Sequence, residues 1–233
     1  MTVIVTGASK GIGKSIAAVF AANGYDLVLC SRSEVSLYKA LEELVTLYPA
    51  VKIVARAYDL SIKEKAIEFG EWCLSMGTPD ILINNAGLFQ PGNVYDEPEG
   101  MLEEQLAINL FSAYHITRVL LPSMMAGRSG HIFNICSIAS LDAYRNGGAY
   151  SISKFAMYGF SKNLREEMKE YGIKVTAVLP GAVLTNSWGD FDNTSKRIME
   201  ASDIARMVFA SSQLSAAACV EEILIRPQLG DLD

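Results

Sequence analysis

Short apolar runs alternate along the chain with longer segments in which apolar residues recur at helical spacing. The runs cover 2–6, 26–30, 51–58, 80–84, 131–136, 174–179 and 220–225, and most of them lack polar alternation. Strands of this kind are typical of a parallel sheet that helices cover on both faces. Helices are expected near 12–23, 34–48, 61–76, 100–126, 149–171 and 201–211, with Gly24, Gly77 and Gly172 at three of their ends.

This order of elements predicts a single α/β domain over residues 1–233, with a doubly wound, seven-stranded and mainly parallel Rossmann-type sheet. Hydrophobic residues make up 50% of the chain, which is enough to bury a full core. The longest poorly patterned piece is residues 181–200, where a substrate loop is expected. A lid and a variable surface loop explain its composition equally well.

Composition excludes several classes of function. A formal charge of -6 leaves no basic face for a nucleic acid. The cysteines are far apart and read as reduced thiols, and two histidines without neighbouring ligands predict no metal site. The first residues show no signal peptide, and no run approaches the roughly 20 apolar residues of a membrane span. A cytoplasmic protein without membrane contact is expected. These cysteines and histidines are Cys30, Cys73, Cys136, Cys219, His115 and His131.

Glycines cluster directly after the first predicted strand. Gly7, Gly11 and Gly13 in VTGASKGIG stand where this strand passes into the first helix. Glycines at such a turn let the backbone approach a pyrophosphate and offer it the N–H groups of the helix N-terminus. The turn therefore predicts a dinucleotide site, although its spacing is GxxxGxG and not the commoner GxGxxG.

The end of the second predicted strand indicates which dinucleotide binds. An Asp or Glu there binds the ribose 2′-hydroxyl of NAD, but this chain has Ser31 followed by Arg32. A guanidinium suits the 2′-phosphate of NADPH, and Lys10 in the glycine turn adds a second cation. NADPH is predicted in preference to NAD. The alternative is that Arg32 and Lys10 are ordinary surface charges.

Three polar side chains in the second half of the chain suggest carbonyl chemistry. Tyr150 and Lys154 are four residues apart and share one face of a helix. A lysine ammonium lowers the pKa of a neighbouring tyrosine and suits it to acid and base catalysis. Ser137, just beyond the fifth strand, can donate to a substrate oxygen. A nucleophilic serine is disfavoured because no GxSxG elbow surrounds it, and a packed tyrosine beside a snorkelling lysine is the structural alternative.

A series of motifs, taken in order along nearly the whole chain, resembles the short-chain dehydrogenase/reductase family. The motifs are TGASKGIG, YDL at 58–60, NNAG at 84–87, INL around Asn109, ICSIAS around Ser137, the Tyr150 and Lys154 pair, and PGAVLT at 180–185. The resemblance implies a catalytic tetrad of Asn109, Ser137, Tyr150 and Lys154. In it, Asn109 holds a water in a proton relay from Lys154, and Lys154 also bonds the nicotinamide ribose.

The resemblance further implies a set of cofactor contacts. Asp59 accepts from the adenine amine with Leu60 beside it, Asn85 braces the sheet, Gly87 passes close to the ribose, and Thr185 holds the carboxamide. The full set implied is Gly7, Ser9, Lys10, Gly11, Ile12, Gly13, Ser31, Arg32, Asp59, Leu60, Asn85, Ala86, Gly87, Tyr150, Lys154, Pro180, Gly181, Val183 and Thr185.

Three substrate classes remain open. The endings PGAVLTNSWGDF and CVEEILIRPQLGDLD resemble bacterial sepiapterin reductase-like carbonyl reductases, which favours a small dicarbonyl or pteridine substrate. A 3-oxoacyl-[acyl-carrier-protein] reductase is the alternative. Such enzymes dock an acidic carrier on basic residues, and this chain supplies Arg128 but has Glu170 and Tyr171 where a second basic residue would help. An NADPH-binding sensor or scaffold with little turnover is the third. Phe89, Gln90, Leu141, Tyr144, Trp188 and Phe191 are candidates to line the pocket.

The resemblance also implies an oligomer. Family members pair through the fourth and fifth helices, and the fifth here carries more apolar residues than one sheet face needs. A homodimer or homotetramer is expected. The apolar residues in question are Phe155, Tyr158, Phe160 and Leu164.

Overall fold

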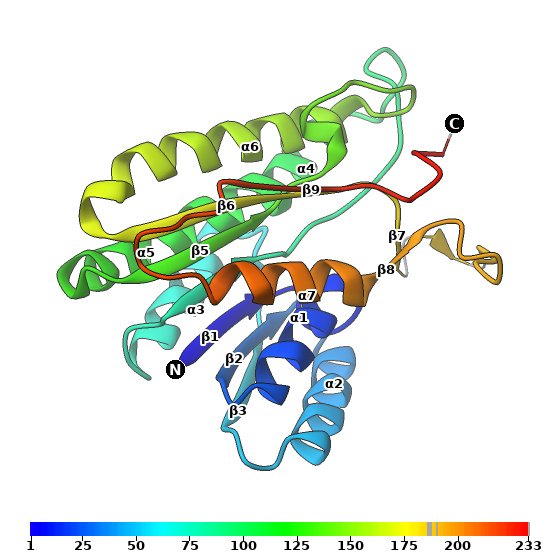
Figure 1. Ribbon diagram of the computed structural model, residues 1–233. Helices are drawn as coiled ribbons and strands as arrows, with labels where there is room; N and C mark the ends of the chain where they lie inside the picture. The colour runs from blue at the N-terminus through cyan, green and yellow to red at the C-terminus, as the bar shows by residue number, and fades with distance from the viewer. Residues whose placement is uncertain (186–187, 190, 233) are drawn as a thin grey trace.

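A computed structural model describes residues 1–185, 188–189 and 191–232. Seven parallel strands form its central sheet in the order β3-β2-β1-β4-β5-β6-β9 (Figure 1), so the predicted doubly wound sheet is confirmed. The strand order reverses between β1 and β4, and ligands of such folds bind at that point, outside the carboxyl ends of the strands. The strands are β1 Thr2–Thr6, β2 Asp26–Ser31, β3 Ile53–Ala57, β4 Ile81–Asn84, β5 Gly130–Ile135, β6 Ile173–Pro180 and β9 Glu222–Ile225.

Helices cover both faces of this sheet. The helices α1, α2 and α7 pack on one face, and α3, α5 and α6 pack on the other (Figure 1). Neighbouring residues of β1 serve opposite faces, because Val3 and Val5 join the first core and Ile4 joins the second. The helices are α1 Gly11–Ala22, α2 Glu34–Leu47, α3 Lys63–Leu74, α4 Met101–Leu106, α5 Ser112–Gly127, α6 Gly148–Met168 and α7 Ala201–Ser212.

The helix predicted over 100–126 is not one regular helix. A π-helical turn, Ala107–Phe111, separates α4 from α5 and contains Asn109. Such a turn adds one residue to the helical repeat, and it often marks a functional site. The apolar period fits an α-helix on both sides of the insertion, so the sequence pattern could not reveal it.

The segment predicted as a loop, residues 181–200, has a short paired stem. Here β7 Val183–Leu184 pairs in parallel with β8 Met199–Glu200. The Asn193 side chain accepts from the backbone N–H of Ile198 at 3.0 Å and donates to its carbonyl at 3.1 Å. Strands of two residues carry no periodic signal, which is why the sequence did not predict them. Residues 186, 187 and 190 of this segment lie outside the described residues.

The apolar residues expected at a subunit contact divide into two groups. Leu164 is only 4% exposed and lies in the core with Phe160 packed against it, so Leu164 cannot serve a contact between subunits. Phe155 is 43% exposed on the same helix, α6. The outer side of α6 therefore offers fewer apolar residues than the sequence suggested.

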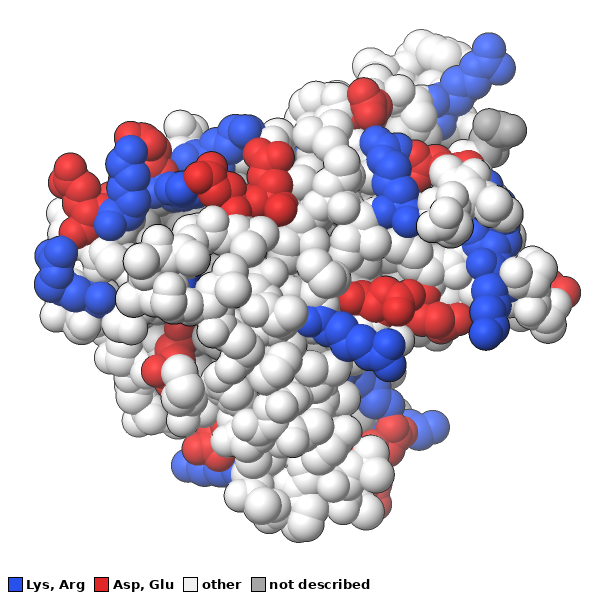
Figure 2. All heavy atoms as spheres, in the orientation of Figure 1, with Lys and Arg blue, Asp and Glu red and all other residues white. Residues whose placement is uncertain are grey.

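Charged residues of both signs are interspersed on the face of the molecule shown in Figure 2, and uncharged surface lies between them. No helix in the described part of the chain has the length and apolar character to cross a membrane.

Candidate active site

The glycine turn after β1 is packed against the end of β4. The Asn85 amide donates to the carbonyls of Thr6 at 2.9 Å and Gly7 at 3.2 Å. A side chain on Gly7 would begin 2.8 Å from the Asn85 nitrogen, and one on Gly13 would overlap both that nitrogen and the Gly7 carbonyl. Glycine is required here for close packing of the turn as well as for its positive φ of 64° at Gly7.

Thr6 ties the two strands that flank the switch point. Its hydroxyl accepts from the backbone N–H groups of Asn85 and Ala86, both at 2.9 Å, and donates to the carbonyl of Ile83 at 3.3 Å. Thr6 is 1% exposed, so these bonds are shielded from water. Thr6 was not predicted as a site residue, although the pair TG at the end of an apolar strand was a signal for it.

The N-terminus of α1 is suited to an anion. No side chain caps it at Lys10, and its first turn contains no acidic residue. Its first N–H groups and its dipole are thus available to a phosphate. A side chain on Gly11 would begin 3.3 Å from the methyl of Thr185, so β7 ends beside this turn.

The predicted 2′-phosphate site lies where the glycine turn meets the end of β2. The hydroxyls of Ser9 and Ser31 are 2.9 Å apart and join the two segments. Lys10 and Arg32 are exposed next to this contact, and neither forms an ion pair within the described residues. Two cations without an acidic partner fit a dianionic group.

The predicted adenine contacts have partners of their own. Asp59 Oδ1 accepts from the backbone N–H of Ser61 at 3.1 Å and from its hydroxyl at 2.6 Å, as in an ordinary turn. Leu60 is 3% exposed and packs in the core, which leaves its backbone for a ligand. Both adenine contacts stay predictions.

The other predicted cofactor residues lie at the same edge of the sheet. A side chain on Gly87 would begin 3.3 Å from Asn109 Oδ1 and 3.6 Å from Lys154 Nζ, so the backbone after β4 passes next to the catalytic candidates. Ile12 is in the first turn of α1, Pro180 ends β6, Gly181 follows it, and Val183 begins β7.

Ser137 and Tyr150 bring two hydroxyls together beyond the end of β5. Ser137 is 8% exposed, and its hydroxyl accepts from the N–H of Ala139 at 3.1 Å. The Ser137 proton is donated in the hydrogen bond to Tyr150 that lowers the pKa of the tyrosine. Tyr150 is in the first turn of α6. Its ring contacts the Phe89 ring edge to face, with the two centroids 4.8 Å apart and an interplanar angle of 84°. The tyrosine ring is held while its hydroxyl faces Ser137.

The pKa of Tyr150 is opposite in direction to the sequence prediction. Burial raises the pKa of Tyr150 to about 12, and the hydrogen bond with Ser137 lowers it only in part. Lys154 Nζ donates to the Ile135 carbonyl at 2.9 Å and lies 5.8 Å from the centroid of the Tyr150 ring. No contribution from Lys154 offsets the effect of burial on the Tyr150 pKa, so the predicted lowering by Lys154 is wrong for this structure. Burial also lowers the pKa of Lys154 itself.

Three hydrogen bonds fix the side chain of Asn109 in the structure. Its Oδ1 accepts from the Leu88 N–H at 2.7 Å, and its Nδ2 donates to the Leu88 carbonyl at 3.0 Å and to Ser153 Oγ at 2.8 Å. Both amide protons are engaged, so the side chain has no donor left for a relay water. Asn109 is a positioning residue that fastens the chain after β4 to α6; the relay stays a prediction.

The comparison with known proteins agrees with this geometry. The family model described as short chain dehydrogenase matches residues 1–196. The chain belongs to the short-chain dehydrogenase family. An uncharacterized oxidoreductase of Staphylococcus saprophyticus is 32% identical over 225 residues, covering 96% of each chain. A sepiapterin reductase of Chlorobaculum tepidum is 32% identical over 246 residues, covering 98% of this chain and 97% of the relative.

A solved structure of a metagenomic short-chain oxidoreductase in complex with NADP superposes with a TM-score of 0.86 at 29% identity, covering 98% of this chain and 97% of that one. This short-chain dehydrogenase is therefore an oxidoreductase, and its Rossmann-type fold is confirmed.

Glu97 is a site residue that the sequence analysis of this short-chain dehydrogenase missed. Its Oε1 accepts from the N–H of Ala149 at 2.8 Å, at the start of α6 and next to Tyr150. A side chain on Gly148 would overlap that carboxylate, so glycine is needed for the approach. A carboxylate at a helix N-terminus stabilises the first turn. The glycine pair at 147–148 was the available signal for such a close approach.

The candidate pocket residues separate into two sets. Phe89 touches Tyr150, and Tyr144 is close enough to raise the pKa of Tyr150 slightly. Trp188 and Phe191 pack on each other, with ring centroids 5.3 Å apart, on the 181–200 segment. Gln90 is in the chain after β4 and its Oε1 is buried without a partner in the described residues, while Leu141 packs in a small core beside α6.

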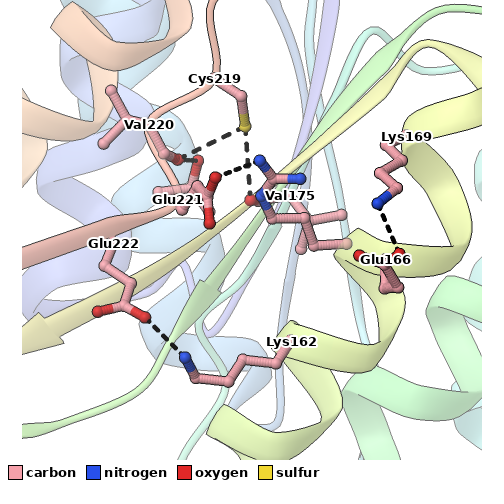
Figure 3. Close-up of polar contacts among 10 residues, drawn as sticks. Lys162, Glu166, Lys169, Val175, Cys219, Val220, Glu221 and Glu222 are labelled. Atoms are coloured by element: carbon pink, nitrogen blue, oxygen red, sulfur yellow. Dashed lines mark hydrogen bonds and ion pairs between the residues drawn. The ribbon is translucent and has the colours of Figure 1, made fainter.

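A separate cavity of about 430 Å³ lies between α6, β6 and the chain entering β9. Figure 3 shows that its charged groups are paired, Lys162 with Glu222 at 3.0 Å and Lys169 with Glu166. Its charges neutralise one another, and the catalytic candidates are not among its lining residues. The dehydrogenase site is therefore the one at the carboxyl edge of the sheet.

Proposed function

We propose that this enzyme reduces the carbonyl group of a small molecule to an alcohol, with NADPH as the cofactor and Tyr150 as the proton donor. One observation carries the proposal. The hydroxyls of Ser137 and Tyr150 face each other beyond the end of β5, and burial raises the pKa of Tyr150 to about 12. A phenol with this pKa keeps its proton at neutral pH, as the acid in a reduction must.

The residues of the chain divide the work on the substrate. Ser137 turns its hydroxyl proton from Tyr150 to the carbonyl oxygen of the substrate and steadies the charge that develops there. Tyr150 gives its proton to the forming alkoxide, which is a stronger base than a phenolate. Lys154, whose ammonium lies 5.8 Å from the centroid of the tyrosine ring, is the residue that the family resemblance assigns to the nicotinamide ribose. When bound, NADPH supplies the hydride.

The preference for NADPH over NAD rests on Arg32 and Lys10. Both are exposed beside the Ser9 and Ser31 contact and have no acidic partner in the described residues. The structural neighbour in complex with NADP, at 29% identity over nearly the full chain, supports the same cofactor. The residues that would hold it are the turn at 7–13, the end of β2, and the backbone at 85–87.

The favoured substrate is a small dicarbonyl or a sepiapterin-like pteridine ketone. The sepiapterin reductase of Chlorobaculum tepidum, 32% identical over nearly the whole chain, supports this class. Phe89, 41% exposed beside Tyr150, and Tyr144, 46% exposed, offer aromatic surface to a flat substrate. Reduction of 3-oxoacyl thioesters is the alternative, and a sensor or scaffold with little turnover is the third class.

A panel of substrates separates the three classes. NADPH oxidation is followed with diacetyl-type dicarbonyls, sepiapterin and acetoacetyl thioesters, and each reaction is repeated with NADH. Turnover of dicarbonyls or sepiapterin with NADPH is expected. Turnover of the thioester alone would replace the substrate class, and binding of NADPH without turnover of any carbonyl would favour the sensor.

A homodimer or homotetramer is part of the proposal. Four apolar side chains on and beside α5 and α6 are between 38% and 47% exposed, namely Phe111, Tyr114, Ile152 and Phe155. Exposed apolar side chains on these helices support a contact with another subunit. Light scattering distinguishes a dimer from a tetramer, and a monomer would contradict the proposal. The cytoplasmic location stays a prediction from the sequence.

A further inference from the structure

The C-terminal tail, residues 226–232, lies against the start of the 181–200 segment. The N–H of Gly181 donates to the carbonyl of Ile225 at 2.8 Å. A side chain on Gly181 would begin 2.8 Å from Asp231 Oδ1, and this oxygen is buried without a hydrogen-bond partner in the described residues. Glycine at position 181 therefore admits the Asp231 carboxylate. This is a second reason for the glycine that was predicted to serve the cofactor.

The tail is also bound at the far end of the same segment. Arg197, two residues before β8, donates through Nη1 to the Gly230 carbonyl at 2.9 Å and through Nη2 to the Asp231 carbonyl at 2.8 Å. A guanidinium can span two successive carbonyls in this way because its donors are arranged as a rigid fork, which a lysine ammonium lacks. A turn in the tail, closed by the Gly230 N–H on the Pro227 carbonyl at 2.9 Å, presents the two carbonyls.

A third contact joins the tail to the loop that follows Ser137. Arg226 is paired with Asp231 within the tail, and its other nitrogen is 3.4 Å from Asp142. Asp142 follows Leu141 and precedes Tyr144, both candidates to line the substrate pocket. Figure 1 shows the tail, in red, on the same side of the molecule as the orange 181–200 segment. One short stretch of chain thus touches both loops that border the site.

The 181–200 segment depends on such contacts because its own stem is short. The pairing of β7 with β8 covers two residues of each strand. Charge-assisted hydrogen bonds to Arg197 contribute more than neutral ones, and part of their strength comes from the half-buried setting. Without them the segment would be held chiefly by the stem and by Asn193.

We propose that the tail is a latch which restrains both ends of the 181–200 segment, at Gly181 and at Arg197, and joins them to the loop that carries Asp142, with Arg197 and Arg226 as its positioning residues. The latch thereby sets the affinity for the carbonyl substrate. Its kinetic consequence rests on the proposed function, whereas the restraint of the segment does not. A tail that merely seals the sheet edge would change the melting temperature and leave the affinity for substrate unaltered.

Two full-length variants test the latch. Arg197→Lys keeps the charge and the trypsin site but cannot span two carbonyls, and Arg226→Gln removes both ion pairs. Lys169→Gln, which breaks the exposed pair with Glu166 at the far end of α6, is the matched control. The measurements are the rate of trypsin cleavage after residues 196 and 197, the KM for the carbonyl substrate, and the Kd for NADPH.

If the tail acts as a latch, we expect trypsin to cleave Arg197→Lys about 10-fold faster than the wild type. We expect the KM for the carbonyl substrate to be about 5-fold higher in both variants, with kcat changed less than about 2-fold. Cleavage and KM equal to those of the wild type in both variants would overturn it, and so would the same changes in Lys169→Gln. The two proposals fail separately. If trypsin cleaves Arg197→Lys no faster than the wild type, the latch is excluded even if carbonyls are reduced. Faster cleavage supports the latch even if no carbonyl of the panel is turned over.

Discussion

The cofactor side and the substrate side of this enzyme are held together in different ways. On the cofactor side, Thr6 and Asn85 bind the backbone of adjacent strands, so the glycine turn is fixed by the sheet itself. On the substrate side, segments far apart in the chain meet through single side chains, as Glu97 does at Ala149 and Arg197 at the tail. The difference indicates that the nucleotide site is part of the core, whereas the substrate site is assembled from loops.

This division separates substitutions by what they should change. A change at the glycine turn acts on strands that are buried, so it affects folding and cofactor binding together. A change at a loop contact moves a catalytic or substrate-facing group and spares the sheet. Tyr150 stands between the two, because it is carried by a long helix whose first turn depends on a loop carboxylate.

The largest effect on folding is expected from Gly13→Ala. A methyl group at this position overlaps the Asn85 amide and the Gly7 carbonyl, and neither can move without breaking the bonds between β1 and β4. We expect the free energy of unfolding to fall by about 3 kcal/mol and NADPH binding to be lost. Denaturant unfolding measures the first and fluorescence titration the second.

Gly127→Ala is the control for Gly13, because nothing lies within 4 Å of a side chain at position 127. Its stability should stay within about 0.5 kcal/mol of the wild type. Equal losses in the two variants would mean that the turn is not specially packed.

The next effect is a pH dependence that belongs to the buried sheet. His131 is 5% exposed and its Nε2 is 2.7 Å from Thr176 Oγ1. The hydroxyl of Thr176 donates to the Val220 carbonyl, so it accepts the Nε2 proton of His131. Burial, followed by the charge of Lys174, lowers the pKa of His131 to about 3.

The sign of this dependence follows from proton binding. Below a pH of about 6.5 the unfolded chain binds a proton at His131, but the folded chain does not until about pH 3. Stability is therefore complete above pH 6.5 and falls on acidification by up to about 1.4 kcal/mol per pH unit from this residue. His131→Gln should reduce the difference between the unfolding free energies at pH 6 and pH 4 by roughly 2 kcal/mol. Parallel pH curves for variant and wild type would refute this role.

Arg32→Asp tests the choice of cofactor. An aspartate there repels a 2′-phosphate and can accept from a 2′-hydroxyl, so the ratio of kcat/KM for NADPH over NADH should fall about 30-fold. Arg206→Asp, an exposed change on α7, is the control and should leave that ratio unchanged. If the substitution at Arg32 leaves the ratio unchanged, Arg32 is an ordinary surface charge and does not select the cofactor.

The smallest effect is expected at Glu97. Glu97→Ala leaves the Ala149 N–H without its acceptor, so the first turn of α6 loosens around Tyr150 and kcat should fall about 5-fold. Glu97→Gln keeps an acceptor and should restore most of that loss, while the Kd for NADPH stays constant in both. If the alanine variant turns over as fast as the wild type, the loop does not position the tyrosine.

The same division explains what could be predicted from the sequence. The strands, the glycine turn and the pair Tyr150 and Lys154 lie in periodic or motif-bearing segments, and their places follow from local pattern. The π-helical turn around Asn109 and the contact of Glu97 with α6 do not, because a one-residue insertion preserves the apolar pattern on either side and a long-range contact has no local signature. The pKa of Tyr150 was predicted with the wrong sign, since burial is a property of the folded chain.

The most direct test of the account is Tyr150→Phe, measured by the rate of carbonyl reduction and the Kd for NADPH on the same preparation. Phenylalanine removes the hydroxyl and keeps the ring that packs against Phe89. The account predicts that kcat falls by about 10³-fold and that the Kd for NADPH stays within about 2-fold of the wild type. A variant that reduces its substrate at the wild-type rate would contradict it.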